Sequence, residues 1–262
     1  MPTTYAHDLF GKMVYQRLNP ALKRVIKRHQ TTYQIGLHGP DILFYVRPFH
    51  SNRFNRMAHR LHQEKAADFF EEGRKLYQRT QDEEMLVYLL GFICHFMLDS
   101  TCHPYISEYM KKTGAGHDEI ETEFDRSLML RTGKDPFRYQ PGSVIHIERN
   151  SVKAISEVLN GMSQKDIVRA LIGTKFYTKL PICETEQKRR IKLAVSKVFF
   201  IYPFADGRVI RKEPKTICLE STEHLTGMLC KTVPEAVDMM EEYYNERNGS
   251  ERLNARFNRN YK

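Results

Sequence analysis

Residues 85–104 read MLVYLLGFICHFMLDSTCHP, and this stretch decides the fold of the chain. Almost all of its side chains are apolar, yet His95, Asp99 and His103 follow one another at intervals of four residues. On an α-helix these three side chains project from one face, one turn apart. Ionisable groups in such a helix must be paired, hydrogen-bonded or bound to a metal, because an isolated buried charge is too costly. The stretch therefore predicts a core helix that carries part of a metal site.

A second stretch, HDEIE at residues 117–121, repeats the spacing of four with His117 and Glu121. Zinc prefers histidine nitrogen and carboxylate oxygen at about 2.0–2.2 Å, and catalytic zinc sites leave one position open for water. A bound cation accounts for all five side chains together, so the sequence predicts a zinc-type metalloenzyme. Further candidate ligands come from the N-terminal part of the chain, namely His7, Asp41, His59 and His62.

Each candidate also has a simpler explanation when it is considered alone. A lone histidine on an apolar helix face is usually a hydrogen-bonded core residue, Asp41 alone is a helix cap, and Glu121 alone is a surface acid. Asp125, one turn beyond Glu121, is expected to be solvated. The regular spacing of the whole set, rather than any one residue, favours a metal. The other residues considered are expected to pack in the core or lie on the surface: Cys94, Cys102, His29, His146 and His224.

With 262 residues, the chain suits one large domain or two small ones, and it is long enough to bury a substantial core. Its hydrophobic content of 41% is ordinary for a soluble protein. The formal net charge of +9 favours anionic partners such as phosphate esters, nucleic acid or lipid headgroups. Proteins that bind no polyanion are also often basic, so the charge alone does not select a function.

Three features of the sequence lead us to expect a cytoplasmic protein. The first ten residues, MPTTYAHDLF, contain neither a basic leader nor a long apolar run, so no signal peptide is expected. No stretch approaches the roughly 20 apolar residues that are needed to cross a bilayer. The five cysteines are odd in number and unpatterned, which favours reduced thiols over a disulfide framework.

Apolar residues recur with helical spacing along most of the chain, which predicts an all-α, multi-helix bundle in a single domain over residues 1–262. The central helix is expected to begin near Asp82 and to end at or just after His103, because Pro104 disfavours helical geometry in the residue before it. Asp41 is placed to cap a short apolar segment, and residues 205–214 suggest a small hairpin. The other helices are expected near 6–16, from 20 onward, and at 56–77, 117–130, 150–160, 164–177, 186–201 and 221–247, with 131–150 as a linker.

Four segments occur in a specific order with the spacing of metal ligands: GLHGPDILFY at 36–45, LHQEK at 61–65, YLLGFICHFMLDSTCHP at 88–104 and HDEIE at 117–121. Together they resemble the bacterial zinc-dependent phospholipase C family, and most of all its smaller branch without a leader. The likeness covers a metal-binding cassette at about residues 5–130. The C-terminal helical part, at about 150–247, adds helices but no recognisable motif.

The resemblance implies an all-α fold around a three-zinc cluster that hydrolyses phosphodiester bonds. In the secreted relatives an N-terminal tryptophan completes the third zinc site, whereas this chain contains no tryptophan, so we expect two to three zinc ions. Periodicity does not separate His59 from His62 as a ligand, and the likeness around LHQEK favours His62. Carried over residue by residue, the resemblance implies one zinc held by Asp41, His62, His95 and Asp99, a second held by His103, His117 and Glu121, and a third held by His7 with Asp99 as a bridge.

The leading hypothesis is a zinc-dependent phosphodiester hydrolase of phospholipase C type, acting on a phospholipid at a membrane surface or on a soluble phosphodiester. Two-metal sites clamp a phosphoryl group and acidify a water molecule, and Asp41 is the candidate that orients or deprotonates this water. The alternatives are a nuclease for single-stranded nucleic acid, which the same superfamily includes, and a non-catalytic helical module stabilised by metal. An open, water-accessible metal position would favour an enzyme, and a closed ligand shell would favour a structural role.

Overall fold

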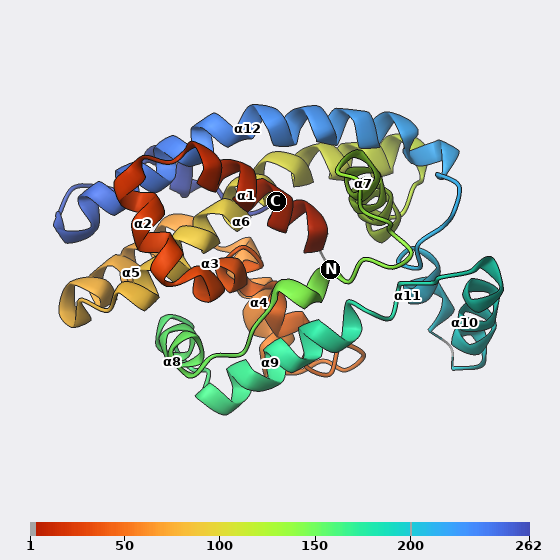
Figure 1. The fold of residues 1–262 in the computed structure, drawn as a ribbon, viewed down its shortest axis with the longest axis horizontal. Helices are drawn as coiled ribbons and strands as arrows, with labels where there is room; N and C mark the ends of the chain where they lie inside the picture. The colour runs from red at the N-terminus through yellow and green to blue at the C-terminus, as the bar shows by residue number, and fades with distance from the viewer. Residues whose placement is uncertain (1–3, 200) are drawn as a thin grey trace.

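Twelve α-helices and five short 3-10 helices make up the described part of the chain, residues 4–199 and 201–262, and no strand occurs there (Figure 1). This computed structural model confirms the all-α fold that the helical spacing predicts. The α-helices are α1 Thr4–Arg17, α2 Pro20–Arg28, α3 Gln30–Gly36, α4 Arg53–Gln63, α5 Ala66–Thr80, α6 Glu83–Thr113, α7 His117–Arg131, α8 Arg149–Val158, α9 Gln164–Tyr177, α10 Glu186–Val198, α11 Tyr202–Asp206 and α12 Leu219–Asn245. The 3-10 helices are η1 Gly39–Tyr45, η2 Pro141–Val144, η3 Thr216–Cys218, η4 Glu246–Asn248 and η5 Ala255–Asn258.

The long helix α6 runs through the middle of the molecule, and α12 packs along it (Figure 1). Asp82 caps α6, because its carboxylate accepts hydrogen bonds from the N–H groups of Glu84 and Met85 at 2.9 and 3.4 Å. Contrary to our expectation, α6 is long and apolar enough to span a membrane, but 94% of that window is buried inside the fold. A helix that is apolar all round is typical of a core surrounded by other helices, and α6 forms such a core here.

The C-terminal end of α6 differs from the prediction. The helix continues to Thr113 instead of stopping near His103, and Pro104 lies inside it, where proline typically costs about 3 kcal/mol. The turns beyond the proline bury Ile106 and Tyr109, and the Tyr109 hydroxyl donates a hydrogen bond to a backbone carbonyl of η3 at 2.8 Å. Burial of two such side chains stabilises the helix by roughly 1.5–3 kcal/mol each, which offsets the cost of the proline.

The single helix predicted at 56–77 does not form, because the chain makes two helices there, α4 and α5, with an extended break between them. The C-terminal tail binds the backbone at this break. The N–H of Ala66 donates to the carbonyl of Arg259 at 3.0 Å, and the N–H of Tyr261 donates to the carbonyl of His62 at 3.3 Å. These tertiary hydrogen bonds satisfy the exposed helix ends, and a helical pattern in the sequence does not report them.

The hairpin predicted at 205–214 does not form, and within this fully described stretch the chain completes α11 and then makes turns without any strand. The N–H of Ile210 donates to the carbonyl of Pro181 at 3.1 Å. Arg208 donates from Nη2 to Oδ1 of Asp118 in α7 at 2.6 Å. The segment therefore binds α7 and the loop after α9 instead of folding back on itself.

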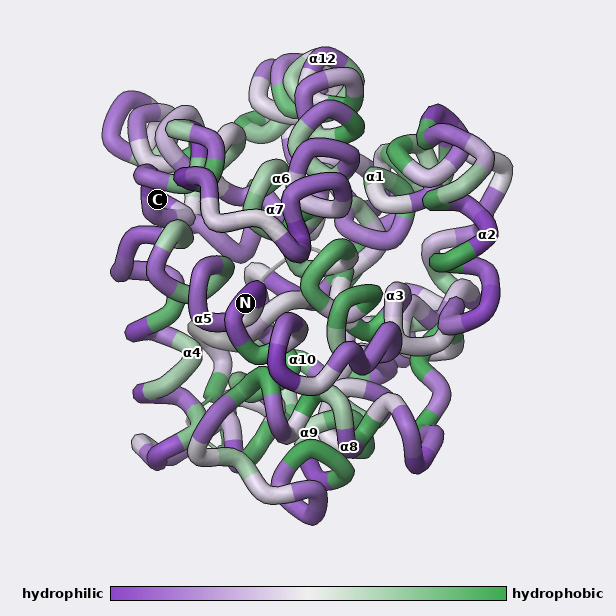
Figure 2. Tube along the Cα trace, turned by 90° about the vertical axis from the view of Figure 1, so that its left-hand side faces the viewer, coloured by the Kyte–Doolittle hydropathy of each residue, from purple (hydrophilic) through white to green (hydrophobic). Residues whose placement is uncertain are grey.

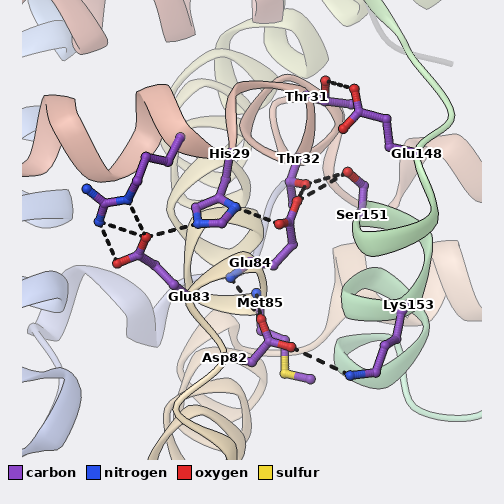
Figure 3. A network of polar contacts seen from close by, with 11 residues as sticks. His29, Thr31, Thr32, Asp82, Glu83, Glu84, Met85, Glu148, Ser151 and Lys153 are labelled. Atoms are coloured by element: carbon purple, nitrogen blue, oxygen red, sulfur yellow. Dashed lines mark hydrogen bonds and ion pairs between the residues drawn. The ribbon is translucent and has the colours of Figure 1, made fainter.

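A polar network ties the corner between α2 and α3 to the first turn of α6 and to α8 (Figure 3). The ring of His29 lies 2.6 Å from Glu84 through Nδ1 and 2.9 Å from Glu83 through Nε2. The Thr32 hydroxyl also donates to Glu84, and it lies 2.6 Å from the hydroxyl of Ser151 in α8. This network anchors the N-terminal end of α6, which lies about 18 Å along the helix from His95, the first candidate ligand in α6.

The hydrophobic core is continuous from Tyr5 in α1 to Tyr261 near the C-terminus. Hydrophilic residues lie along much of the outline of the molecule, and many hydrophobic segments lie toward its middle (Figure 2). Helix α12 packs against α1, α6 and α7, so the C-terminal part shares its core with the predicted metal-binding cassette.

Candidate metal centre

Three neighbouring groups of candidate ligands lie where α1, η1, α4, α6 and α7 meet. Within each group, the ligand atoms lie within 4.8 Å of one another. The structure thus brings together all eight residues that the sequence predicts as ligands. The groups are Asp41, His62 and His95; His7, His95 and Asp99; and His103, His117 and Glu121.

Asp99 lies at the centre of the cluster and is 3% exposed. Its Oδ1 is 3.1 Å from Nε2 of His7. Its Oδ2 is 3.3, 3.6 and 3.8 Å from ring nitrogens of His95, His62 and His103, respectively. Because its two oxygens face different histidines, this carboxylate is suited to bridge two cations.

Asp41 reaches the cluster from η1, and its Oδ1 is 3.2 Å from Nε2 of His62 while its Oδ2 is 3.8 Å from Nε2 of His95. The prediction that Asp41 caps this segment is wrong, because Asp41 lies inside η1 and His38 occupies the N-cap position. Gly39 has a φ of +48°, and a Cβ at this position would lie 2.4 Å from the His95 ring. Only glycine therefore lets η1 pack so closely on α6.

The group of His103, His117 and Glu121 is the most accessible of the three. The side chain of His117 is 38% exposed, whereas that of Glu121 is 6% exposed. Oε1 of Glu121 is 2.9 Å from Nε2 of His117 and 3.4 Å from Nε2 of His103. Since α7 begins at His117, the spacing of four places both of its ligands in its first turns, facing α6.

Two of the histidines are oriented by backbone carbonyls. Nδ1 of His62 lies 2.7 Å from the carbonyl oxygen of Ala58, and Nδ1 of His103 lies 2.7 Å from that of Tyr261. A carbonyl oxygen only accepts hydrogen bonds, so Nδ1 carries the proton in both rings. Each Nε2 is therefore directed at the carboxylates, which is the arrangement that outer contacts impose on metal-binding histidines.

Buried polar atoms without a hydrogen-bond partner among the described residues collect at these groups. They include both carboxylate oxygens of Asp41, both ring nitrogens of His95, Oδ2 of Asp99 and Oε2 of Glu121. An unsatisfied buried polar group typically costs about 1–3 kcal/mol, and more when it is charged. A set of imidazole nitrogens and carboxylate oxygens in this state suits zinc, which would satisfy several of them at once.

The structure also identifies Asp125 as a residue that positions a ligand. The prediction that Asp125 is solvated is wrong, because it is 8% exposed and accepts hydrogen bonds from the N–H groups of Tyr5 and Ala6 at 3.0 and 2.8 Å. It thereby caps the first turn of α1 and fixes the backbone next to His7. The spacing of four from Glu121, which places both carboxylates on one face of α7, is the signal that could have revealed it.

The structure separates the two histidines that periodicity leaves open. His62 lies in the cluster, whereas His59 is exposed and its ring packs on Phe44 with centroids 4.8 Å apart. Cys94 and Cys102 are buried packing residues, as predicted. His38, which the ligand spacing did not predict, is a buried neighbour of the cluster, and burial lowers its pKa to about 3.

Burial and the neighbouring carboxylates set the protonation of the ligand histidines in opposite directions. Burial lowers the pKa of His95 to about 4, so this ring is neutral near pH 7. Burial also disfavours the charged form of His62 and His103. The contacts of His62 with Asp41 and Asp99 nevertheless raise its pKa to about 10, and the Asp99 and Glu121 carboxylates raise the pKa of His103 to about 9. Zinc must therefore displace protons when it binds these two rings.

Zinc-loaded and zinc-free protein should respond to pH in opposite ways. In the zinc-free protein, the folded pKa values of about 10 and about 9 lie above the ordinary value of 6.5. The stability from these two charge pairs is therefore complete below pH 6.5 and is lost as the pH rises through 9–10. Zinc binding is weakened by acid, because it needs neutral rings. We expect the difference in melting temperature between loaded and chelated protein to grow from pH 6 to 8.5, and a difference that shrinks over this range would contradict the assignment.

An open pocket of about 380 Å³ adjoins the outer ligand group, and Glu121 and Asp125 form part of its wall. Its volume lies in the usual range for ligand-binding pockets, about 300–1,000 Å³. A small cavity of about 10 Å³, close to what one water molecule requires, lies among the ligands of α1, α6 and α7. One of the candidate ligands, Glu121, thus borders a pocket that opens to solvent, as ligands of catalytic metal sites do.

The fold and the site together define an all-α protein with a cluster of ligands suited to zinc. The model of the family described as zinc dependent phospholipase C matches residues 2–170, a segment that contains all eight candidate ligands. The chain therefore belongs to the zinc-dependent phospholipase C family, which implies a zinc-dependent hydrolase of phosphodiesters. The match extends beyond the predicted cassette into α9, and α10 to α12 lie outside it. Searches of curated proteins and of solved structures found no match.

Proposed function

We propose that this protein is an enzyme that hydrolyses phosphodiester bonds with two or three zinc ions. The pocket that reaches Glu121 carries the proposal, because it gives a substrate access to this ligand of the outer group. A metal site with a purely structural role has no need of such an opening, since its ligand shell is closed. The His117 side chain of the outer group is partly exposed to solvent, which also supports a catalytic role over a structural one.

Eight residues serve as the zinc ligands in this proposal. When bound, the ions supply positive charge that neutralises a phosphodiester and favours deprotonation of water. Residues 1–3, which precede the third group, lie outside the described part of the chain. Asp41, His62, His95 and Asp99 would hold one ion, His103, His117 and Glu121 would hold a second, and His7 together with Asp99 would hold a third.

Other groups of the chain orient the reactants. Asp41 orients the attacking water or accepts its proton, a role open to a buried carboxylate whose oxygens have no hydrogen-bond partner among the described residues. Asp125 holds His7 in place through the backbone of α1. Arg208 lines the pocket beside Glu121 and brings a guanidinium group, the side chain best shaped to bind phosphate oxygens.

Metal content and activity test this proposal together. Protein purified without chelator is expected to contain at least two zinc ions per chain by elemental analysis, because seven or more nitrogen and oxygen ligands exceed the needs of one four-coordinate ion. The loaded protein should hydrolyse a chromogenic phosphodiester faster than the matched phosphomonoester. A measured content of one zinc or none would contradict the multinuclear site. Cleavage of single-stranded DNA alone would indicate a nuclease. Full zinc content without turnover of any of these substrates would indicate a non-catalytic module.

A further inference from the structure

Helix α10 is set apart from the rest of the molecule. It lies at the right-hand edge in Figure 1, and it packs mainly against the short helix α11. Within α10, all of which the structure describes, Ser196 is the only buried residue. A helix of this length that buries so little of itself within its own chain has a second face available for another partner.

The exposed face of α10 is apolar. Ile191, Val195, Val198 and Phe199 follow at i, i+4, i+7 and i+8, the spacing of one helix face. Val198 is 72% exposed and Phe199 is 69% exposed. Seven of the twelve exposed large hydrophobic side chains of the described residues fall between residues 172 and 199, and four of these seven lie on this face of α10 and at its C-terminal end.

Basic side chains flank this apolar face. The sequence of α10, EQKRRIKLAVSKV, contains five lysines and arginines and a single acid. The side chain of Arg190 is 81% exposed, and Lys197 is exposed near the apolar end of the helix. A helix with an apolar face and cationic flanks is the arrangement that binds the interface of an anionic bilayer.

The exposed apolar face of α10 borders the pocket at the metal centre. Ile191 and Val195 belong both to the exposed face of α10 and to the wall of the pocket, and Glu121 forms another part of the same wall. The pocket is lined mainly by apolar side chains, among them Leu180, Ile182 and Ile210. The pocket therefore borders both the exposed face of α10 and Glu121 of the outer ligand group.

We infer that α10 docks on an anionic phospholipid bilayer and that the adjoining pocket receives an acyl chain of a lipid drawn from that bilayer. With the acyl chain of the lipid in the pocket, the phosphodiester of the same lipid reaches the ligand group at Glu121. This placement rests on the proposed function. The docking itself rests only on the exposed apolar face and its basic flanks. Since α10 lies outside residues 2–170, it is an addition to the part of the chain that matches the family.

Sedimentation with vesicles tests the docking without any need for turnover. The zinc-loaded full chain is mixed with vesicles of phosphatidylcholine alone or of phosphatidylcholine with phosphatidylserine. We expect clear binding to the anionic vesicles that weakens with added salt, because the attraction to a charged surface is screened. Val198→Glu, at a position that contacts little of the fold, should reduce binding at least about tenfold, and Arg190→Glu should reduce it at least about fivefold.

Two matched controls address general effects of added charge. Ile147→Glu introduces the same charge at another exposed apolar residue, just before α8, a helix that Figure 1 shows well away from α10, and Lys231→Glu reverses a charge in α12. Both should leave vesicle binding within about twofold of the parent. Equal binding to both kinds of vesicle, equal effects of variants and controls, or binding of a single-stranded oligonucleotide in place of vesicles would overturn the inference.

Activity on two substrates separates this inference from the proposed function. Val198→Glu should leave hydrolysis of a short, soluble phosphodiester unchanged while lowering hydrolysis of phospholipid in vesicles at least about tenfold. Hydrolysis of the soluble diester without binding to anionic vesicles would overturn the docking and leave the proposed function intact. Binding that depends on Val198 and Arg190, without hydrolysis of any diester, would support the docking and overturn the proposed function.

Discussion

Removal of zinc is expected to lower the melting temperature of the protein by about 15 °C or more. Each ion present at about 1,000 times its dissociation constant stabilises the folded state by about 4 kcal/mol, and two ions contribute about twice that. For a chain of this size, 1 kcal/mol shifts the melting temperature by about 2–4 °C. Without zinc, the carboxylates of Asp41 and Asp99 stay buried, at 2% and 3% exposure, with only imidazole rings to balance their charge, and a buried carboxylate that is incompletely paired is costly.

Thermal melts before and after chelation measure this effect, with elemental analysis to show that the metal is gone. His62→Ala should remove much of the chelator-sensitive stability, because His62 faces both carboxylates. His59→Ala, on the exposed side of the same helix, is the matched control and should melt like the parent in both states. Equal melting temperatures for the loaded and the chelated protein would show that the bound metal does not stabilise the fold.

Asp99→Asn is expected to lower zinc content and phosphodiesterase activity more than any other single ligand change, with activity reduced more than about 100-fold. Loss of a residue that only supports a ligand typically costs about 10–100-fold, and Asp99 contacts four histidines directly. The amide keeps the shape of the carboxylate but removes the charge that would bridge two ions. Zinc content should fall in more than one group at once.

Glu121→Gln is the matched comparison, because it makes the same change at a carboxylate that faces only His103 and His117. It should remove at most one zinc and leave the inner groups loaded. Elemental analysis and assays of the two variants decide the point, with circular dichroism to confirm that both remain helical. Equal losses, or a greater loss in Glu121→Gln, would mean that Asp99 does not bridge.

Helical spacing was sufficient to predict most of the fold and the two pairs of candidate ligands that lie within single helices. Residues four apart in α6 and in α7 lie on one face wherever a helix forms, so the proximity of His95 to Asp99 and of His117 to Glu121 follows from local geometry. The burial of α6 follows equally directly from its apolar composition.

Other features depend on tertiary contacts that spacing does not encode. His59 and His62 differ by less than one turn, and only the packing of η1 against α4 selects His62. The continuation of α6 past Pro104 depends on the burial of residues that lie beyond the proline. The role of Asp125 depends on α1, more than a hundred residues away in the sequence.

The contact between the C-terminal tail and the metal ligands has a consequence for biosynthesis. The carbonyl of Tyr261 orients the ring of His103, and the N–H of Tyr261 binds the backbone of His62. While residues near 261 are still inside the ribosome, α6 and α7 can pack, but the His103 imidazole lacks the carbonyl that orients it and the backbone of His62 lacks its partner. We therefore expect the zinc site to be completed only after Tyr261 has emerged from the ribosome, so that the nascent protein passes through a helical state with an incomplete site.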